Sequence, residues 1–334
     1  MKKIIAFFIV VLFLGVSAGA CFWLDLMHYA QTPAGIDSKT RVVVVETGDG
    51  FSAVAHRLAQ AQLNPQPFKF TALARLKGYD KQIKAGEYEL AATMPPQRLL
   101  EVLVSGKVRL YRLTIPEGYA LGQIAQEAER AGFGPAAAFV HEATAPGQAQ
   151  RYGIEAETLE GYLFPDTYHF PRNARARQVI TAMVHRFQEV FTPQWQARAK
   201  EIAMTVHQVV TLASIIEKET GDAAERPLIA SVFHNRLGRG MRLETDPTVI
   251  YGIENFDGNL TRKHLATATP YNTYRIRGLP PGPIASPGAD ALKAALYPAE
   301  SPYLYFVSRK NRTHQFSTNL DDHNRAVRRY QLRR

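Results

Sequence analysis

The sequence predicts an α+β protein that begins with a membrane-spanning helix, and three observations support this prediction. Lys2 and Lys3 precede an uncharged apolar run at residues 4–24, which is long enough to cross a bilayer as a helix. Short β-branched runs then alternate with apolar patterns of helical period. The second half of the chain consists mostly of helical patterns separated by Pro-rich and Gly-rich loops. With 334 residues, 46% of them apolar, the chain can bury more than one hydrophobic core.

The N-terminal apolar run allows three interpretations. The basic residues before it and Asp25 after it predict a single-pass anchor with a cytoplasmic N-terminus and the rest of the chain outside. A cleaved signal peptide is an alternative because residues 17–20 are small, and Cys21 hints at a lipoprotein site without the usual leucine. We favour the anchor because residues 22–24 continue the apolar run. The expected location is the inner (plasma) membrane, with an anchor at 1–27, a linker at 28–40 and a periplasmic or otherwise extracytoplasmic folded part.

Composition excludes several kinds of site. The one cysteine rules out an internal disulfide and a cysteine-based zinc cluster. The ten histidines are scattered, and no His-Glu-x-x-His motif is present. The net charge of +10 fits an anionic polymer of the cell envelope, nucleic acid or a solvated basic surface. Because every interpretation of the N-terminus exports the chain, nucleic acid is not an expected partner, and neither a metal nor a cofactor is predicted.

Between residues 41 and 133 the chain predicts two similar strand-turn-helix units. Residues 41–46 form a β-branched strand, and a Gly-containing turn leads from it into an amphipathic helix. Residues 108–115 again predict a strand, followed by a Pro-Glu-Gly-Tyr turn and a helix that ends near Gly132. Units of this size resemble LysM-type modules, which bind the N-acetylated sugars of peptidoglycan; the alternative is a purely structural β-α module. Between the two units the sequence predicts helices at 67–76 and 97–103 and an extended segment at 86–90.

Three segments lead from this region to the second half of the chain. Residues 134–157 are rich in Ala, Gly and Gln and predict a domain junction. Residues 159–168 alternate aromatic side chains with Gly and Pro, which fits a sugar-stacking loop or a turn that caps the core. Residues 174–200 predict one long helix.

The next helical pattern is apolar and ends in a Glu-Lys-Glu sequence. At 3.6 residues per turn, Val210 and Ala213 lie in an apolar row whose next member is Glu217. Gly221 predicts the helix end, so burial and the negative end of the helix dipole would both disfavour the ionised form of Glu217. A carboxyl of this kind can stay protonated near neutral pH and act as a general acid.

The alternative is a solvated or salt-bridged surface glutamate with Lys218 or Arg226 as its partner. Glu219 lies two residues further on and faces another side of the helix, so the two glutamates are not paired acids from one helix. Asp222 then predicts a helix cap, with Glu225 reaching back from three residues on.

The residues after this cap supply polar groups on stiff loops. Segments 241–252, 271–274 and 278–288 place Asn, Asp, Thr and Tyr among prolines and glycines. Such loops suit a glycan cleft, because hydroxyl groups need hydrogen-bond partners and sugar rings stack on aromatic faces. The helix before these loops is expected to bury Ile229, Val232, Phe233 and Leu237 and to expose His234, Asn235 and Arg236.

Six motifs in this order resemble the endolytic murein transglycosylase family, the YceG-like proteins. They are Leu-Ala-Ser-Ile-Ile-Glu-Lys-Glu-Thr at 212–220, Ala-Ser-Val-Phe-His-Asn-Arg-Leu at 230–237, Thr-Asp-Pro-Thr-Val-Ile-Tyr-Gly at 245–252, Tyr-Asn-Thr-Tyr at 271–274, Gly-Leu-Pro-Pro-Gly at 278–282 and Pro-Tyr-Leu-Tyr-Phe at 302–306. The resemblance covers essentially the whole chain and is sharpest after Gly161. It implies that Glu217 is the catalytic acid of a domain at 134–334. The candidate substrate-binding residues in these motifs are Asn235, Asp246, Thr248, Tyr271, Asn272 and Tyr274.

The resemblance implies a membrane-anchored enzyme that cleaves the β-1,4 bond between N-acetylmuramic acid and N-acetylglucosamine within peptidoglycan glycan strands. Glu217 would protonate the glycosidic oxygen and then take the proton from the C6 hydroxyl of the muramic acid, which closes a 1,6-anhydro ring. The implied role is termination of nascent strands, with peptidoglycan synthases at the membrane as partners. The alternatives are a muramidase-type hydrolase with Asp246 or Glu219 as second carboxylate, and a non-catalytic peptidoglycan-binding scaffold of the cell-wall machinery.

Overall fold

The computed structural model describes residues 2–219 and 222–332, and its architecture is α+β, as the sequence predicts. Contacts within the chain divide it into two compact units. The N-terminal unit contains residues 1–111 together with 170–173, and the C-terminal unit contains residues 112–169 and 174–334. The domain boundary near residue 134 stays a prediction; the division by contacts lies earlier and assigns residues 112–133 to the same unit as Glu217.

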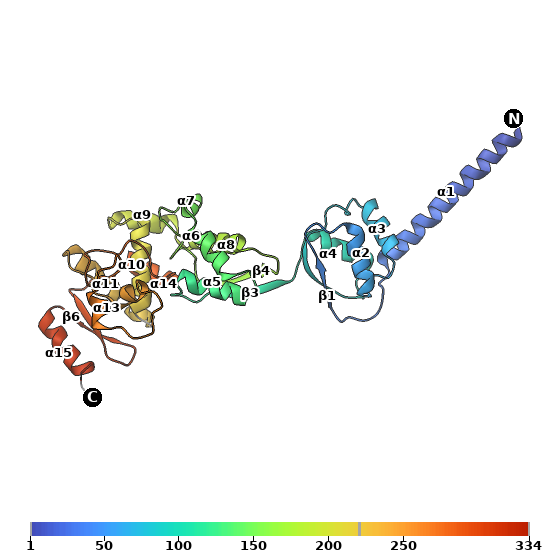
Figure 1. Ribbon diagram of the computed structural model, residues 1–334. Helices are drawn as coiled ribbons and strands as arrows, with labels where there is room; N and C mark the ends of the chain where they lie inside the picture. The colour runs from blue at the N-terminus through green and yellow to red at the C-terminus, as the bar shows by residue number, and fades with distance from the viewer. Residues whose placement is uncertain (1, 220–221, 333–334) are drawn as a thin grey trace. The chain divides into compact units, whose positions relative to one another are not determined.

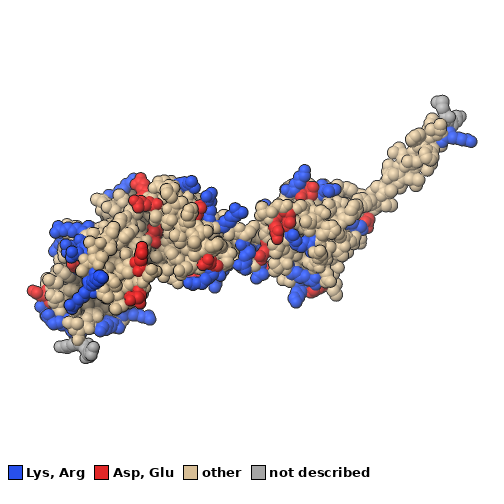
Figure 2. Space-filling view, viewed as in Figure 1, with Lys and Arg blue, Asp and Glu red and all other residues tan. Residues whose placement is uncertain are grey.

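Helix α1 (Lys2–Gln31) begins the N-terminal unit (Figure 1). Residues 3–31 of this helix are long and apolar enough to cross a membrane, and Figure 2 shows its middle without charged side chains on the visible face. The helix extends beyond the predicted anchor end at residue 27, and its last turns pack into the core of the unit through Leu26, Tyr29 and Ala30. The segment expected as a linker from residue 28 therefore starts as helix and leaves it only after Gln31.

The core of the N-terminal unit lies between a two-stranded sheet and three helices. Strand β1 (Arg41–Val45) pairs antiparallel with β2 (Gly86–Leu90), with Val43 opposite Tyr88. Both of these side chains are buried, because alternate residues of each strand face the helices. These elements confirm the predicted strand and helix ranges of this region. The helices are α2 (Phe51–Gln60), α3 (Pro67–Leu76) and α4 (Pro96–Ser105).

A second two-stranded sheet contains β3 (Leu110–Thr114) and β4 (Thr167–Pro171), and the division between the units runs through both strands. The segment at 134–157, expected as a domain junction, contains two helices. Phe139 and Ala143 are buried there against neighbouring helices, which explains why an Ala-rich segment folds. The helices between β3 and β4 are α5 (Leu121–Arg130), α6 (Ala136–Thr144) and α7 (Gln148–Arg151).

The long helix predicted at 174–200 is two helices, α8 (Ala176–Val190) and α9 (Pro193–Glu201). The break has a local cause. The hydroxyl of Thr192 accepts a hydrogen bond from the backbone N–H of Trp195, and Pro193 occupies the first helical position. A threonine cap followed by proline starts a new helix rather than continuing an old one.

Helix α10 (Val206–Glu219) forms the centre of the C-terminal unit. All eight residues from 209 to 216 are buried, so this helix is surrounded on every side over two turns. Helices α11 (Arg226–Gly238) and α14 (Ala289–Leu296) pack against it and against each other (Figure 1). The expected end of α10 at Gly221 lies outside the described residues.

The remaining elements surround this helical core. Asp222 caps the short helix η1 (Ala223–Glu225), as predicted, by accepting a hydrogen bond from Ala224. Glu225 does not reach back to complete the cap, because its carboxylate binds the backbone N–H and Nδ1 of His314 (2.9 and 2.7 Å). It thereby ties η1 to a C-terminal hairpin, against which α15 packs. The other elements are α12 (Asp246–Tyr251), α13 (Arg262–Ala266), the antiparallel pair β5 (Tyr305–Ser308) and β6 (His314–Ser317), and α15 (Leu320–Tyr330).

Candidate active site

Glu217 lies in the last turn of α10, and its side chain is only 6% exposed. Its Oε1 atom accepts a hydrogen bond from Nη2 of Arg226 in α11 (2.8 Å). Its Oε2 atom accepts one from the backbone N–H of Gly288, which caps α14 (2.9 Å). The apolar row thus correctly predicts burial, and Arg226 is confirmed as the ion-pair partner named in the alternative. A solvated surface position is wrong, because three helices hold this carboxyl.

The Pro-Glu-Gly-Tyr turn before α5 lies directly against Glu217. Gly118 has a φ of +75°, and a Cβ atom placed there would lie 3.5 Å from Cγ of Glu217. The Nζ atom of Lys218 donates to the carbonyl oxygen of Gly118 (3.2 Å). Ser286, in the loop before α14, exchanges backbone hydrogen bonds with Gly118 and Tyr119 (2.9 and 2.8 Å). These contacts join the turn, the end of α10 and the start of α14 into one packed surface around Glu217.

Arg226 contacts three carboxylates, although its own side chain is only 11% exposed. Nη2 lies 2.8 Å from Glu217 and 3.6 Å from Oε2 of Glu117, and Nη1 lies 3.6 Å from Asp290. Burial raises the pKa of Glu117; the charge of Glu217 raises it further, Arg226 opposes the rise and Asp290 adds to it. The site around Glu217 therefore contains a second carboxylate, from a turn to which the sequence assigned no functional role.

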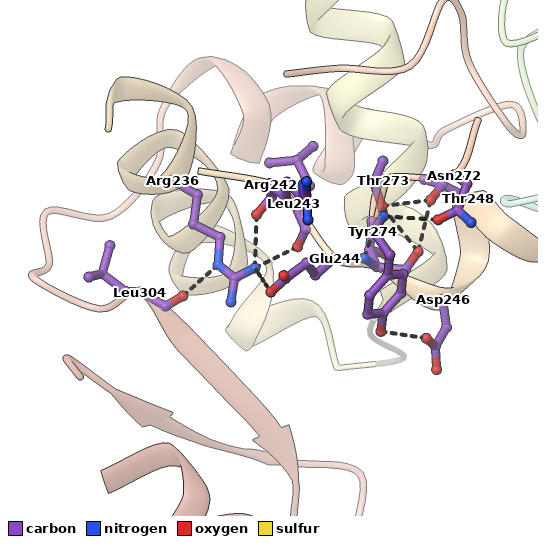
Figure 3. A network of polar contacts seen from close by, with 11 residues as sticks. Arg236, Arg242, Leu243, Glu244, Asp246, Thr248, Asn272, Thr273, Tyr274 and Leu304 are labelled. Carbon is purple, nitrogen blue, oxygen red and sulfur yellow. Dashed lines mark hydrogen bonds and ion pairs between the residues drawn. The ribbon is translucent and has the colours of Figure 1, made fainter. Parts of the chain in front are cut away.

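Glu219 has different surroundings from Glu217, as its spacing predicts. It accepts a hydrogen bond from the hydroxyl of Thr245, and burial raises its pKa to about 7. The hydroxyl of Tyr274 donates to Asp246 (2.7 Å), as Figure 3 shows. Glu219, Asp246 and Tyr274 line a cavity of about 470 Å³. Two of the predicted substrate-binding residues, Asp246 and Tyr274, thus lie together at a hollow on the Glu219 side.

Thr248 and Asn272 are fully buried and bind their own chain. The hydroxyl of Thr248 contacts the Thr273 hydroxyl (2.8 Å) and donates to the Thr245 carbonyl (2.8 Å) (Figure 3). The side-chain amide of Asn272 donates to carbonyls at the end of α13, the shortest contact being 2.6 Å to Thr267. Its Oδ1 atom accepts the N–H of Tyr274 (3.0 Å). Both side chains shape the loop that carries the aromatic residues Tyr271 and Tyr274.

Asn235 and Arg236 hold the C-terminal hairpin on α11. Asn235 donates to two backbone carbonyls just before β5 (2.8 and 2.9 Å). Arg236 is 7% exposed, so the prediction that it faces solvent is wrong. The guanidinium has internal acceptors, which satisfy its charge where water is excluded. It donates to the carbonyls of Leu304, Leu243 and Arg242 at 2.7, 2.8 and 3.0 Å (Figure 3).

Tyr271 stands near a buried carboxyl, Glu160. Its ring packs against Tyr251 with centroids 4.8 Å apart, and the hydroxyl of Tyr251 donates to Glu160 (3.1 Å). The backbone N–H of Leu121 also donates to Glu160 (3.1 Å). Burial raises the pKa of Glu160 to about 7. Glu160 comes from the aromatic loop at 159–168. The sequence pattern there indicated a role for the aromatic residues but not for this carboxylate.

The sequence patterns also did not identify Glu117 and Gly288 as site residues. Both stand in short Gly-containing and Pro-containing sequences, Pro-Glu-Gly-Tyr and Ser-Pro-Gly, and an acidic residue inside the first of these was the available signal. Residues 117 and 288 come together only through tertiary packing. Among the described residues, no group of three or more His, Cys, Asp or Glu side chains has the arrangement of a metal site.

The chain is similar to several known proteins. A Bacillus subtilis protein named endolytic murein transglycosylase is 33% identical over 315 residues, which is 89% of this chain and 87% of that protein. A Streptococcus pneumoniae protein of the same name is 32% identical over 360 residues, covering 98% of this chain but 65% of that protein, so this chain spans somewhat under two thirds of it. A crystal structure of a YceG-like protein from Listeria monocytogenes is 34% identical and superposes with a TM-score of 0.60, covering 86% of this chain and 98% of that one.

The family model described as the YceG-like family matches residues 43–329. That range contains most of both units, with Glu217, Arg226 and the turns that enclose them. Because this match spans most of the chain and the curated relatives are about one third identical along nearly all of it, the chain belongs to the YceG-like family.

Proposed function

We propose that this protein is a lytic transglycosylase that cleaves peptidoglycan glycan strands internally, with Glu217 as its catalytic acid and base. The observation that carries the proposal is one carboxyl, almost fully buried at the end of α10 and held by Arg226 and the Gly288 N–H. The names of the relatives at 31–33% identity support the substrate and the reaction.

The reaction needs one group that gives a proton and then takes one. Protonated Glu217 donates to the glycosidic oxygen between N-acetylmuramic acid and N-acetylglucosamine, and the bond to the anomeric carbon breaks. The resulting carboxylate accepts the proton of the C6 hydroxyl. At the same time the C6 oxygen attacks the anomeric carbon and closes the 1,6-anhydro ring. The nucleophile belongs to the same sugar, so proximity replaces a second catalytic carboxylate. The proton returns to Glu217, and no water is consumed.

The two fixed donors around Glu217 support this double role. A carboxylate oxygen has more than one lone pair, so the contacts with Arg226 and Gly288 leave acceptor capacity for a substrate hydroxyl. They also fix the orientation of the carboxyl and stabilise the negative charge that forms on it when the proton leaves. General acid and base catalysis then depends on the substrate oxygen coming within hydrogen-bond distance.

The other parts of the chain support finer proposals. We assign α1 to a single-pass membrane anchor with a cytoplasmic N-terminus, because of its length, its apolar residues and the lysines before it. The two-stranded β1-α2-α3-β2 arrangement supports a LysM-like role in binding glycan. Asp246 and Tyr274 at their cavity, together with Tyr271, are the proposed sugar contacts, whereas Asn235, Thr248 and Asn272 position the loops. For such an anchored enzyme we propose termination of nascent strands next to membrane synthases.

The test is Glu217→Gln, assayed on purified peptidoglycan with the sugar ends identified by mass. The amide keeps the volume and can still accept a hydrogen bond, but it cannot shuttle a proton. We expect the rate to fall by at least ~100-fold while the melting temperature changes little. The matched control is Glu219→Gln in the same helix, which should keep most of the activity.

Product identity separates the alternatives. The wild-type protein should produce 1,6-anhydro-muramic acid ends; reducing ends would instead indicate a muramidase-type hydrolase with a second carboxylate. A non-catalytic scaffold would produce neither kind of end. A Glu217→Gln variant that keeps more than roughly a tenth of the wild-type rate would show that another group is the acid.

A further inference from the structure

Three carboxylates compete for the cation beside the catalytic carboxyl. Arg226 donates to Glu217 and also lies 3.6 Å from both Glu117 and Asp290. Lys218 neighbours the same group, but its ammonium is bound to the Gly118 carbonyl (3.2 Å). One guanidinium therefore balances three negative groups when all of them are ionised.

The carboxylate of Glu117 lies in space that is open only because residue 288 is a glycine. Gly288 has φ −76° and ψ 173°, a conformation open to any residue, so its backbone does not require glycine. A Cβ atom there would lie 1.9 Å from Oε1 and 2.2 Å from Cδ of Glu117. The Glu117 carboxylate thus occupies the space that a side chain at 288 would fill, while the N–H of the same residue binds Glu217.

We infer that Glu117 is a positioning residue for the Glu217 carboxyl: its negative charge on Arg226 weakens the hold of Arg226 on Glu217, which leaves that carboxyl able to keep the proton it must deliver. The inference deepens the proposed function and rests on it. An unshared arginine at hydrogen-bond distance strongly favours a neighbouring carboxylate over the carboxylic acid. A second carboxylate on the same cation opposes that effect, and Nη2 of Arg226 lies 2.8 Å from Glu217 and 3.6 Å from Glu117. The pKa of Glu117 is raised mainly by burial, and the charge of Glu217 adds to the rise.

Glu117 and Glu217 come from distant parts of the chain, and their arrangement depends on the same backbone contacts. The turn carrying Glu117 is joined to the loop before α14 by the two hydrogen bonds of Ser286. Half of the Glu117 side chain is exposed, compared with 6% for Glu217.

The test is the pH dependence of the rate at which full-length protein in detergent forms anhydro ends on glycan strands. In wild type the rate should fall on the alkaline side as the catalytic carboxyl loses its proton. Glu117→Gln removes a negative charge, so Arg226 holds the Glu217 carboxylate more strongly and the proton leaves at lower pH. We expect the alkaline midpoint to move about one pH unit toward acid, which is about a tenfold loss on that limb, with the acid-side rate and KM nearly unchanged.

Three further variants distinguish charge from packing. Gly288→Ala pushes the flexible end of Glu117 away without altering its charge, and it should shift the midpoint in the same direction. Glu117→Asp keeps the charge and should restore most of the wild-type profile. Asp290→Asn removes a more exposed carboxylate, 70% exposed, from the same arginine and should produce a smaller shift of the same sign.

An unchanged alkaline midpoint in Glu117→Gln would overturn the inference. A loss of rate that is equal at every pH in a folded variant would also overturn it, because only a structural role predicts that result. Wild-type protein that cleaves but shows either outcome contradicts the inference alone. Wild-type protein that forms no anhydro ends contradicts the proposed function and this inference together.

Discussion

At the scale of single residues, Glu160 is a buried carboxyl with a pKa of about 7. Its pKa is higher in the folded protein than in the unfolded chain, so folding binds the proton more tightly. The stability that results is complete below about pH 4.5 and is lost as the pH rises through about 7. We expect the C-terminal unit to lose on the order of 2 kcal/mol over this range, as measured by urea unfolding at several pH values.

Glu160→Gln should reduce this pH dependence, because the amide keeps the hydrogen bond from Leu121 but has no charge to bury. Glu219, whose pKa burial also raises to about 7, contributes the part that remains. Glu157→Gln, at an exposed glutamate three residues earlier, is the matched control and should leave the slope unchanged. Equal slopes for wild type and Glu160→Gln would show that Glu160 is ionised in the folded protein throughout.

The residues around Glu217 show what spacing along the chain can predict. The apolar row through Val210 and Ala213 correctly places Glu217 in the core, because helical period relates residues a few positions apart. Glu117 is 100 positions from Glu217, and no local pattern relates them. Arg236 was expected in solvent because a charged residue is seldom buried; three backbone carbonyls that satisfy its guanidinium become visible only in the folded chain.

At the scale of elements, Asn272 fastens the end of α13 to the loop that carries Tyr271 and Tyr274. Asn272→Ala leaves several carbonyls without their donor in a buried position. We expect a loss of about 2 to 3 kcal/mol in the free energy of unfolding. Asn272→Asp, which keeps the shape but loses the donors, should destabilise the protein at least as much.

Kinetics separate this positioning role from direct binding of substrate. A loosened loop should raise KM in proportion to the lost stability, and lower temperature should recover part of the affinity. Unchanged unfolding with a large rise in KM would instead indicate that the Asn272 side chain contacts the glycan.

Element boundaries could be predicted where the sequence carries a local stop or start. Helix α3 begins at Pro67 as expected, and β2 begins at Gly86. The break before α9 also has a local cause, the threonine and proline at 192 and 193, which the long apolar pattern obscured. Helices α6 and α7 could not be predicted in this way, because an Ala-rich segment becomes a stable helix only when neighbours bury residues such as Phe139.

At the scale of the whole molecule, the end of α1 is part of the N-terminal core. Tyr29 donates its hydroxyl to Asn64 (2.6 Å), and Leu26, Tyr29 and Ala30 are almost fully buried. A truncated protein that begins at Asp25 should therefore be more stable than one that begins at Thr40, by several kcal/mol in the unfolding of this unit. Melting curves of the two proteins decide this, and equal melting temperatures would contradict it.

Both truncated proteins should still cleave peptidoglycan, since the Glu217 site lies in the C-terminal unit. A protein that begins near Pro135 should be inactive, because it lacks Gly118 and Tyr119 and so loses a wall of that site. We therefore expect residues 112–133 to be required for catalysis.

The continuity of α1 has a further consequence for how the protein finds its substrate. The helix runs unbroken from Lys2 to Gln31, and its last turns are already inside the N-terminal unit. If the apolar part of α1 lies in a bilayer, no flexible linker separates the membrane from the first folded unit. A protein anchored in this way would search for strands in a plane instead of a volume, and it would meet first the polymer that lies nearest the membrane surface.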